Sequence, residues 1–527
     1  MASFSAEILK LIFEFFLNDI NSLLSCLVVN RQFAQVTTSI IWENPWKYVE
    51  KERDEIKLLK IIISFLSDKS RKILKEHGIF IPPPSKPPSF DYVSLCRNLV
   101  YSRINLMTEL ISCLPEYNIS KVSVIQISDN RNGSTNLLVG QNEPYNFYLI
   151  KQEIYKMYVS RCQSLERLEF HDIDIPLPFF KGVERFFSNL CELHCDTSLL
   201  SGTYYRMAQI CQNLERLIIE DCCYDNDGLA TLIEAQTKLK YLKIITKGSE
   251  EHGNSRYNRY SRISSAMSSQ ARSLLYFEIG GSFVKGISPV TIATFENLQN
   301  LNIGFHGKYE DILRYSSFPQ LRVLECHHVS NPLDILINFI ERTNELIEKI
   351  SFGINSVTDF HLIRQYNQTI ARCCPNLKFL TTWFTIGDVA DFKIMLISCP
   401  KLEHLTIGSY ENEGEYHTAK IEELINVINE VESEMKPRLL KLWRIEFRFA
   451  WEIRNMLPLS NYLRKRKEKI LRSNSKKPLK MMELYFSSSF MYTLKEDEKI
   501  ELIEKLEYYK LEGLIKNFGF SEYEKLC

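Results

Sequence analysis

The sequence lacks an apolar run long enough to cross a membrane. Its longest apolar stretch, residues 58–66, is interrupted by Lys60, whereas a membrane-spanning helix needs about 20 apolar residues. It also lacks the basic start and small-residue cleavage site of a secretory signal, because Glu7 and Lys10 interrupt the first apolar stretch. These absences predict a soluble intracellular protein, located in the cytoplasm, the nucleus or both, with no membrane contact.

An excess of charge of either sign is also missing. The chain has 65 Lys and Arg residues against 65 Asp and Glu residues, so the overall balance gives no reason to expect an anionic partner such as nucleic acid. The basic cluster at residues 464–477 could be a nuclear address or a nucleic-acid patch. A solvated helix face explains the same residues, and we therefore expect no nucleic-acid partner.

Catalytic motifs are absent as well. The sequence shows no Ser/His/Asp set, no Gly-rich phosphate loop and no paired acids at a recognisable spacing. His171 and the pair His327-His328 directly follow predicted strands, where exposed polar residues are expected. The sequence thus predicts a non-catalytic protein with no catalytic residue and no cofactor.

What the sequence does contain is a repeated phrase. Two apolar residues lie three positions apart and a third follows two positions later, as in Leu165/Leu168/Phe170 and Leu214/Leu217/Ile219. The first apolar residue of each copy falls at positions 165, 190, 214, 239, 274, 298, 321, 347, 377 and 402. Most copies are 23 to 26 residues apart, within the period of about 20–29 residues that is typical of leucine-rich repeats.

This phrase predicts a short strand followed by a helix in each copy. The last two apolar residues share one face of a strand, and the first turns in from the preceding loop. Between copies, segments such as 333–340 and the residues after Asp227-Gly228 carry helix signals. Because one strand and one helix cannot bury their apolar faces alone, we expect an α/β solenoid, a horseshoe of strand-helix repeats.

The 14 cysteines do not indicate a disulfide framework, because a long chain without a secretory signal is expected to keep its thiols reduced. Six lie at fixed repeat positions and are expected in the core: Cys162, Cys195, Cys211, Cys326, Cys374 and Cys399. The segment 191–195, with His194, and the pair Cys222-Cys223 could be taken for zinc ligands. Repeat position explains Cys195 and Cys222, so no metal site is predicted.

Residues 4–46 form a second unit that the pattern predicts as three helices. In the first helix, apolar residues cover most of the surface and leave only a narrow polar stripe formed by Glu7, Lys10 and Glu14. Three helices in about 40 residues lie near the lower limit for an independent core. The surplus apolar face is either the core of a small bundle or a surface for a partner.

The residues of this unit resemble the F-box motif. The matching elements, in order, are Glu7-Ile8-Leu9, Ile12-Phe13, Leu23-Leu24, Cys26-Leu-Val28, Asn30-Arg31-Gln-Phe33 and Trp42, while Phe4-Ser5 replaces the usual opening Leu-Pro. Joined to leucine-rich repeats, the chain resembles the F-box/leucine-rich-repeat family, and its Trp-x-Asn-Pro-Trp ending is similar to that of fungal members.

The resemblance implies a substrate-recognition subunit of an SCF (Skp1-cullin-F-box) ubiquitin ligase, with Skp1 as the partner that connects the chain to a cullin and its RING subunit. It implies that the following residues contact Skp1: Phe4, Ile8, Leu9, Ile12, Phe13, Leu17, Leu23, Leu24, Val28 and Trp42. The repeats would then hold an unidentified protein substrate. From strand geometry alone, we expect substrate contacts at Arg167, Glu169, Arg216, Lys243, Asn302, Arg322 and Glu325.

The predicted organisation has five parts. These are an F-box (1–46), a helical connector that ends in a Pro-rich linker (47–90), degenerate or capping repeats (91–160), the leucine-rich-repeat solenoid (161–487) and a helical cap (488–527). Proline at 82–84 and 87–88 makes the linker stiff and extended. An alternative is a leucine-rich-repeat scaffold or inhibitor, unconnected with ubiquitin, whose N-terminal helices only cap the solenoid.

Overall fold

The computed structural model describes most of the chain. The described residues are 4–49, 51–113, 118–119, 143–171, 175–222, 225–245, 261–281, 288–304, 310–326, 333–343, 345–353, 359–384, 389–409, 419–434, 441–448, 451–452, 457–472, 480–487, 494 and 496–521. They divide into two compact units, Met1–Tyr241 (unit 1) and Leu242–Cys527 (unit 2). The pair His327-His328 and Cys223, which the sequence analysis considered, lie outside the described residues.

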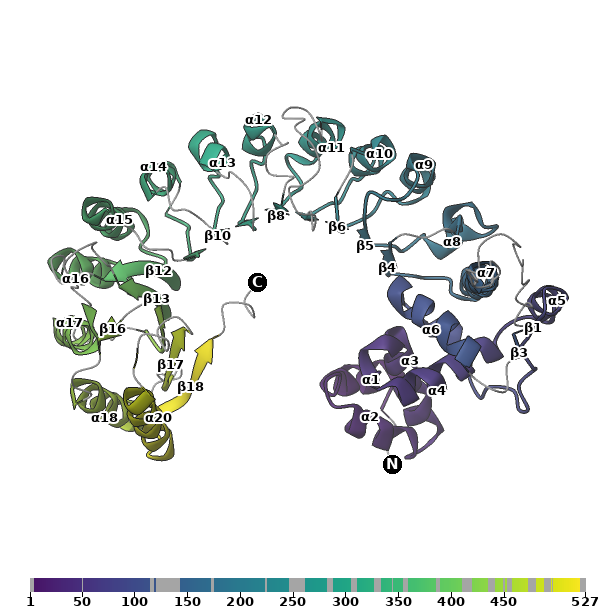
Figure 1. Cartoon of the computed structure of the whole chain (residues 1–527), viewed down its shortest axis with the longest axis horizontal. Coiled ribbons are helices and arrows are strands. Elements are labelled where there is room, and N and C mark those ends of the chain that lie inside the picture. The colour runs from purple at the N-terminus through teal and green to yellow at the C-terminus, as the bar shows by residue number, and fades with distance from the viewer. Residues whose placement is uncertain are drawn as a thin grey trace, which may run out of the picture. The chain divides into compact units, whose positions relative to one another are not determined.

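Helices and short strands alternate along both units (Figure 1). Unit 1 contains α1 (Ala6–Glu14), α2 (Ile20–Leu27), α3 (Arg31–Glu43), η1 (Pro45–Tyr48), α4 (Glu52–Ser64), α5 (Asp68–Glu76), β1 (Ile79–Phe80), η2 (Tyr92–Leu95), β2 (Asn98–Val100), α6 (Tyr101–Cys113), β3 (Asn118–Ile119), α7 (Glu143–Arg161), β4 (Arg167–Phe170), η3 (Leu177–Phe179), α8 (Val183–Phe186), β5 (Glu192–Cys195), α9 (Ser201–Ile210), β6 (Arg216–Glu220) and α10 (Asp227–Glu234). Strand β7 (Tyr241–Ile245) begins at the unit boundary.

Unit 2 repeats the same alternation. It contains α11 (Ser261–Met267), η4 (Ser268–Gln270), β8 (Tyr276–Gly280), α12 (Pro289–Ala293), β9 (Asn300–Ile303), α13 (Glu310–Tyr315), β10 (Val323–Cys326), α14 (Leu333–Arg342), β11 (Lys349–Phe352), α15 (Phe360–Cys373), β12 (Phe379–Phe384), α16 (Val389–Ser398), β13 (His404–Ser409), β14 (Ala419–Lys420), α17 (Ile421–Glu434), β15 (Arg444–Arg448), β16 (Trp451–Glu452), α18 (Leu457–Arg472), β17 (Met482–Ser487), α20 (Glu496–Leu511) and β18 (Ile515–Ser521). None of the helices among the described residues is both long and apolar enough to cross a membrane.

The long strands of each unit form a parallel sheet. In unit 1 the order is β2-β4-β5-β6, and in unit 2 it is β8 to β13 in sequence, followed by β15, β17 and β18. Equivalent residues of successive copies are register partners, as for Leu301, Leu324 and Ile350. In unit 2 the helices lie along one side of the sheet (Figure 1). We call the opposite side of the sheet the open face. The α/β class is confirmed, and the architecture is consistent with the predicted leucine-rich-repeat solenoid.

The apolar triplets form the core, as predicted. In all ten copies, each of the three residues is at most 5% exposed. The later copies at Leu442/Ile445/Phe447 and Met482/Leu484 are also buried. Since burying one aliphatic side chain contributes about 1.5–3 kcal/mol, the repeated triplet is the main source of stability of both sheets.

The six repeat-position cysteines are also buried, which confirms their predicted role in the core. Burial raises the pKa of the Cys195, Cys211, Cys326 and Cys399 thiols to about 12. Some of these thiols connect neighbouring copies, since Cys399 Sγ donates to the Cys374 carbonyl oxygen at 3.4 Å. The small, weakly polar side chain thus fills the core while it satisfies a backbone acceptor.

Two strands of the long parallel sheets lie where the sequence analysis predicted none. Strand β2 pairs with β4 and buries Leu99, but a three-residue strand with one buried leucine carries no triplet to detect. Strand β18 pairs with β17 within the segment for which a helical cap was predicted, directly after α20. Lys516 is an extra residue of β18 between the partners of Met482 and Glu483, and this bulge breaks the alternation by which a strand is recognised.

The Pro-rich linker is held against the helices that precede it. Arg71 in α5 donates from Nη1 to the carbonyl oxygens of Ile81 at 3.1 Å and Pro82 at 2.6 Å. Its Nη2 donates to the carbonyl oxygens of Ile63 at 2.9 Å and Ser64 at 3.2 Å. The planar guanidinium therefore ties the start of the linker to the C-terminal end of α4.

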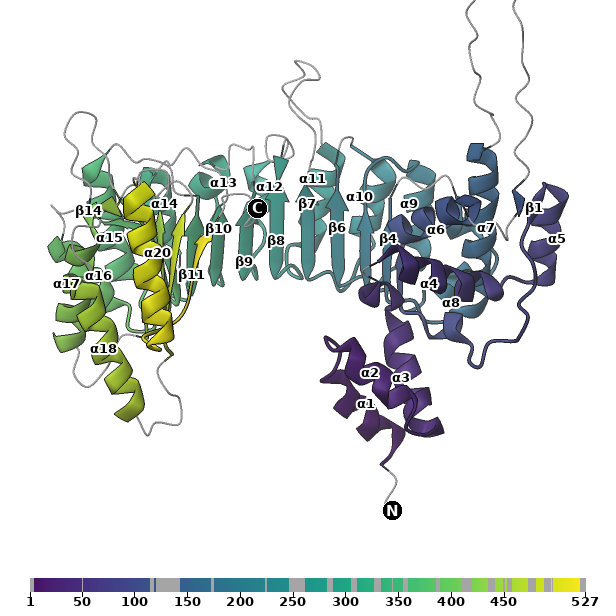
Figure 2. The ribbon, with the colours of Figure 1, turned by 60° about the horizontal axis from the view of Figure 1, so that its bottom comes forward.

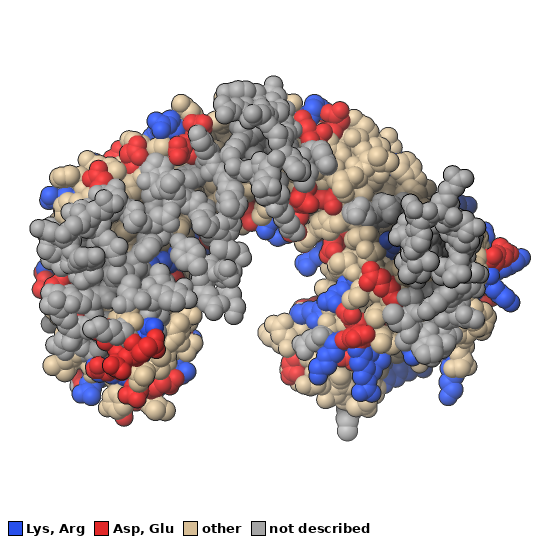
Figure 3. All heavy atoms as spheres, in the orientation of Figure 1, with Lys and Arg blue, Asp and Glu red and all other residues tan. Residues whose placement is uncertain are grey.

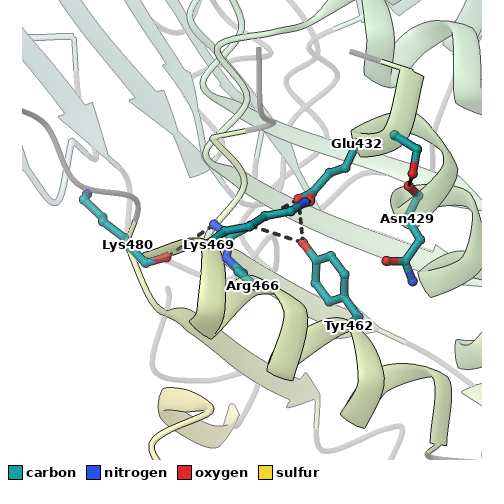
Figure 4. Close-up of polar contacts among 7 residues, drawn as sticks. Asn429, Glu432, Tyr462, Arg466, Lys469 and Lys480 are labelled. Atoms are coloured by element: carbon teal, nitrogen blue, oxygen red, sulfur yellow. Dashed lines mark hydrogen bonds and ion pairs between the residues drawn. The ribbon is translucent and has the colours of Figure 1, made fainter. Parts of the chain in front are cut away.

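Helices α17 and α18 enclose a buried polar cluster (Figure 4). Glu432 accepts from Tyr462 Oη at 3.1 Å and pairs with Arg466 Nη1 at 3.4 Å and Lys469 Nζ at 2.8 Å. The side chains of Glu432 and Arg466 are only 4% and 3% exposed. Arg466 also donates to the Lys480 carbonyl oxygen, so the cluster connects both helices to the start of β17.

Candidate functional site

The first three helices form a small bundle, which we call the head (residues 4–43). Its core consists of Leu9, Phe13, Leu23, Val36 and Ile40. Each helix begins at a side-chain cap: Ser5, Asp19 and Asn30 accept hydrogen bonds from the backbone amides of Ile8, Ser22 and Phe33. The local sequence therefore sets the start of every helix in the head.

The head is joined to the rest of unit 1 through the end of α3. The Glu43 carbonyl oxygen accepts from Arg97 N at 3.0 Å and from Asn98 Nδ2 at 2.9 Å. Trp46 Nε1 donates to the Asn98 carbonyl oxygen at 2.8 Å, and Trp42 stacks on Tyr92 with ring centroids 4.7 Å apart. Figure 2 shows α1 and α2 set off from the sheet, with α3 leading back to it.

The head exposes many large apolar side chains. We call this set the head patch; its exposed fractions are Phe4 58%, Ile8 46%, Leu11 62%, Ile12 40%, Phe15 88%, Leu24 48%, Val28 86% and Val29 58%. Along α1, positions 8, 11, 12 and 15 share one side of the helix, while 9 and 13 point into the core. Soluble monomers seldom expose so many neighbouring apolar groups without a partner.

The residues predicted to contact Skp1 divide into two groups in the structure. Leu9, Phe13, Leu23 and Trp42 are buried within unit 1, and Leu17 packs partly against the head core. The exposed group is Phe4, Ile8, Ile12, Leu24 and Val28. Leu11, Phe15 and Val29 were not among the predicted contacts, although helical spacing alone places Leu11 and Phe15 beside Ile8 and Ile12.

In unit 1, the predicted substrate contacts are engaged in ion pairs and hydrogen bonds. Glu192 Oε2 lies 3.4 Å from Arg167 Nε and 3.3 Å from Arg216 Nε, and Glu192 Oε1 is 2.8 Å from His194 Nε2. The hydrogen bond from His194, together with the two guanidinium groups, lowers the pKa of Glu192. Glu169 Oε1 accepts from the Ser102 amide at 3.2 Å.

The predicted contacts in unit 2 are paired in the same way. Lys243 Nζ lies 3.1 Å from Glu278 Oε1, and Arg322 Nη1 lies 2.8 Å from Glu348 Oε1. Glu325 accepts from Asn302 Nδ2 at 3.3 Å and forms an ion pair with Lys349. These cross-strand pairs satisfy the charges internally, so they leave little unpaired charge for a partner.

A further set of strand residues, which the sequence analysis did not single out, lies in the later repeats of unit 2. Phe379, His404 and Arg444 are register partners on β12, β13 and β15, and the Arg444 guanidinium carbon lies 4.0 Å from the centroid of the Tyr485 ring. Burial, followed by the charges of Arg444, Lys349 and Arg448, lowers the pKa of His404 to about 3. The sequence analysis did not consider the residues between the apolar positions of the copy at 442–447 as contacts.

The cysteine and histidine residues considered as zinc ligands are engaged elsewhere. Cys195 and Cys222 are buried, and His194 contacts Glu192. Within the described ranges, no group of three or more His, Cys, Asp or Glu side chains is placed to hold a metal ion.

Comparison with known proteins finds similarity only at the level of solved structures. No protein-family model matches the chain, and no curated protein matches it. Among solved structures it is similar to the crystal structure of the leucine-rich repeat-containing protein LegL7 from Legionella pneumophila. The identity is 10%, the match covers 59% of this chain and 93% of that chain, and the TM-score is 0.29.

At that TM-score, the similarity supports no conclusion about the fold. The leucine-rich-repeat character is therefore assigned from the chain's own parallel register and buried triplets. Such a sheet presents one row of outward side chains per strand, which is a surface suited to binding proteins.

Proposed function

We propose that this protein is a substrate-recognition subunit of an SCF ubiquitin ligase. In this proposal the head binds Skp1 and the open face of the repeat strands binds a protein substrate. The observation that carries the proposal is the head patch: eight large apolar side chains stay exposed on a three-helix unit whose sequence follows the F-box pattern. The roles of Skp1, the ligase and the substrate in this proposal all depend on these two features taken together.

The energetics of the head patch fit a docking surface. Burial of each aliphatic side chain contributes about 1.5–3 kcal/mol, and a few well-buried anchors usually dominate an interface. Ile8, Ile12 and Phe15 remain exposed although the end of α3 is fixed to β2. A head that served only to cap the sheet would be expected to turn this face inward.

The chain would carry out no bond chemistry in this role. Its contribution would be to hold a substrate lysine near the ubiquitin-charged enzyme that the cullin and RING subunits recruit. Such tethering converts an encounter in solution into an intramolecular one and raises the effective concentration of the lysine.

Co-expression with Skp1 tests the proposal. We expect the intact chain to co-purify with Skp1 and the double variant Ile12→Asp/Phe15→Asp to lose it, because two charges would have to be buried without partners. Leu200→Asp is the matched control, since Leu200 is an exposed leucine at 82% in unit 1 but outside the head. Leu9 is unsuitable for this test because it is 2% exposed and its substitution would unfold the head.

Failure of the folded intact chain to bind Skp1 would refute the proposal, as would equal recovery of the double variant. The second candidate is a leucine-rich-repeat scaffold with no link to ubiquitin. The fixed contact of Trp42 and Trp46 with η2 and β2 favours it, because this contact covers the first strand of the sheet as a cap would.

A further inference from the structure

Arg444 stands apart from the other cationic side chains described on the strands. Each of the others lies in an ion pair with a carboxylate on its own or a neighbouring strand: Arg167 and Arg216 with Glu192, Lys243 with Glu278, Lys349 with Glu325, Arg448 with Glu446 and Lys516 with Glu483. Within the described part of the chain, Arg444 has no carboxylate partner, and its Nε is buried without a hydrogen bond.

The guanidinium of Arg444 is nevertheless held in a fixed position. It lies over the ring of Tyr485 on the adjacent strand β17, 4.0 Å from the ring centroid. A cation over an aromatic face is attracted by the electron-rich ring and keeps its hydrogen-bond donors. The side chain is partly exposed on the open face of the sheet, so the charge is oriented before any partner arrives.

The surface around Arg444 carries aromatic rings and carboxylates that are already paired: its register partner Glu483 pairs with Lys516, and Glu446 pairs with Arg448. His404 lies beside it in register, and the ring of Phe379 packs edge-on against His404 at 5.6 Å. His404 Nε2 also lacks a hydrogen bond among the described residues, since Glu446 Oε2 is 3.9 Å away. Burial, followed by the charges of Arg444, Lys349 and Arg448, lowers the pKa of His404, so the imidazole adds no positive charge beside Arg444.

We propose that Arg444 anchors a carboxylate of an acidic segment of the bound protein on the open face of unit 2, with Phe379, His404 and Tyr485 packing against the residues beside that carboxylate. The inference rests on the proposed function, since it assigns a chemical class to the substrate. A guanidinium can form two parallel hydrogen bonds with one carboxylate. Tyr and Arg are also the residues in which binding energy concentrates at protein interfaces.

Unit 1 contains a matched control for this site. The Arg216 guanidinium carbon lies over the Tyr241 ring, 3.8 Å from its centroid, in the same arrangement as Arg444 over Tyr485. The Arg216 guanidinium is already paired with Glu192, however, with Nε 3.3 Å from Oε2. The two arginines share the ring contact and differ in whether a carboxylate of the chain already pairs with the guanidinium.

The test selects peptides from a random library, so it does not require that the substrate be identified. Phage-displayed random 12-residue peptides are panned against the intact chain, purified without Skp1. We expect the enriched peptides to be rich in Asp and Glu. Resynthesised with a fluorescein label, they should bind the intact chain and the Arg216→Gln variant equally and the Arg444→Gln variant about tenfold more weakly or worse in fluorescence anisotropy.

Several outcomes would overturn the inference: no enrichment, enrichment of peptides without acidic residues, or equal binding by the Arg444→Gln variant. If that variant has a lowered melting temperature, Arg444→Lys replaces it, because lysine keeps the charge but cannot form the paired hydrogen bonds; undiminished binding by Arg444→Lys would also refute a guanidinium anchor. Skp1 recovery is measured on the same preparations. A loss of peptide binding with intact Skp1 recovery, or the reverse, separates failure of this inference from failure of the proposed function.

Discussion

His404 illustrates how one residue of the open face responds to its surroundings. Its ring is largely buried and packs edge-on against Phe379, the charges of Arg444, Lys349 and Arg448 act on it, and Glu446 Oε2 lies 3.9 Å away. The folded chain therefore holds the imidazole neutral, with a pKa of about 3, against about 6.5 in an unfolded chain. Between these two values, unfolding takes up a proton, so stability must decrease as the pH falls.

This linkage predicts a pH-dependent difference between two variants. From pH 7 to pH 5, the intact chain should lose about 2 kcal/mol of unfolding free energy through His404, and His404→Asn should not lose this part. Urea unfolding at both pH values measures the difference. His361→Asn, at an exposed position of α15, serves as the control and should behave like the intact chain. Equal losses in all three proteins would show that His404 is not held neutral.

In contrast to His404, which is held neutral, Glu432 and Arg466 form a buried ion pair (Figure 4). Removing one partner of such a pair leaves the other buried without compensation, at a cost of about 3–5 kcal/mol. We expect Glu432→Leu to lower the urea midpoint strongly and the double variant Glu432→Leu/Arg466→Met to recover most of it. Glu501→Leu, which breaks an exposed pair with Lys505, should cost less than about 1 kcal/mol. If the double variant is no more stable than the single one, packing and not charge sets the cost.

At the scale of single elements, the contact between α9 and α10 depends on a glycine. A Cβ atom added at Gly228 would lie 2.1 Å from the Ser201 carbonyl oxygen, a distance that no backbone atom can tolerate. Asn226 fixes the approach, since its side chain accepts from Leu229 N and donates to the Leu199 carbonyl oxygen. The helix therefore cannot move aside without losing its cap.

Gly228→Ala is expected to destabilise unit 1 despite the higher helix propensity of alanine. The forced separation of α9 and α10 should lower the melting temperature by several degrees, equivalent to about 1–3 kcal/mol. Gly202→Ala is the matched control in α9, because a Cβ at Gly202 meets nothing within 4 Å; it should leave the melting temperature unchanged or raise it. A stable Gly228→Ala chain would mean that the helices separate freely.

The elements that the sequence predicted well are those defined by a local pattern. The triplet at Leu165/Leu168/Phe170 and its later copies located the strands, because the apolar pattern and the buried residues that it predicts lie within one short segment of chain. Strand β18 was missed because its pairing with β17 includes a bulge at Lys516, which breaks the alternating pattern of a strand. The helix at 333–340 was predicted from the start signal Asn331-Pro332 before it and is present as α14.

The candidate surfaces were predictable to a lesser degree, for a physical reason. The sequence identified the apolar residues of α1 but could not decide which side faces the core, because both sides are apolar; the structure assigns Leu9 and Phe13 to the core and leaves Ile8 and Ile12 exposed. On the strands, the sequence placed Arg167 and Arg216 outward but could not show that Glu192 neutralises both. Cross-strand partners are set by register between copies, and this information is not local.

At the scale of the whole molecule, the two proposed surfaces belong to different compact units. The head patch lies in unit 1, and Arg444 lies in unit 2. On the face drawn in Figure 3, both basic and acidic side chains are visible among the described residues, in keeping with the balanced composition. Specific attraction of a partner must therefore come from individual unpaired groups and apolar patches, not from a general field.

This division predicts that the two binding activities can be removed one at a time. Ile12→Asp/Phe15→Asp should abolish Skp1 recovery and leave binding of the acidic peptides unchanged, because each unit has its own buried triplets and the head has a separate core. Arg444→Gln should do the reverse. Pull-down with Skp1 and fluorescence anisotropy with the selected peptides, measured on the same four proteins including the combined variant, give the complete comparison. If Arg444→Gln also reduced Skp1 recovery while its melting temperature stayed the same, the two surfaces would be coupled, and the chain would have to be regarded as a switch between partners and not as a passive tether.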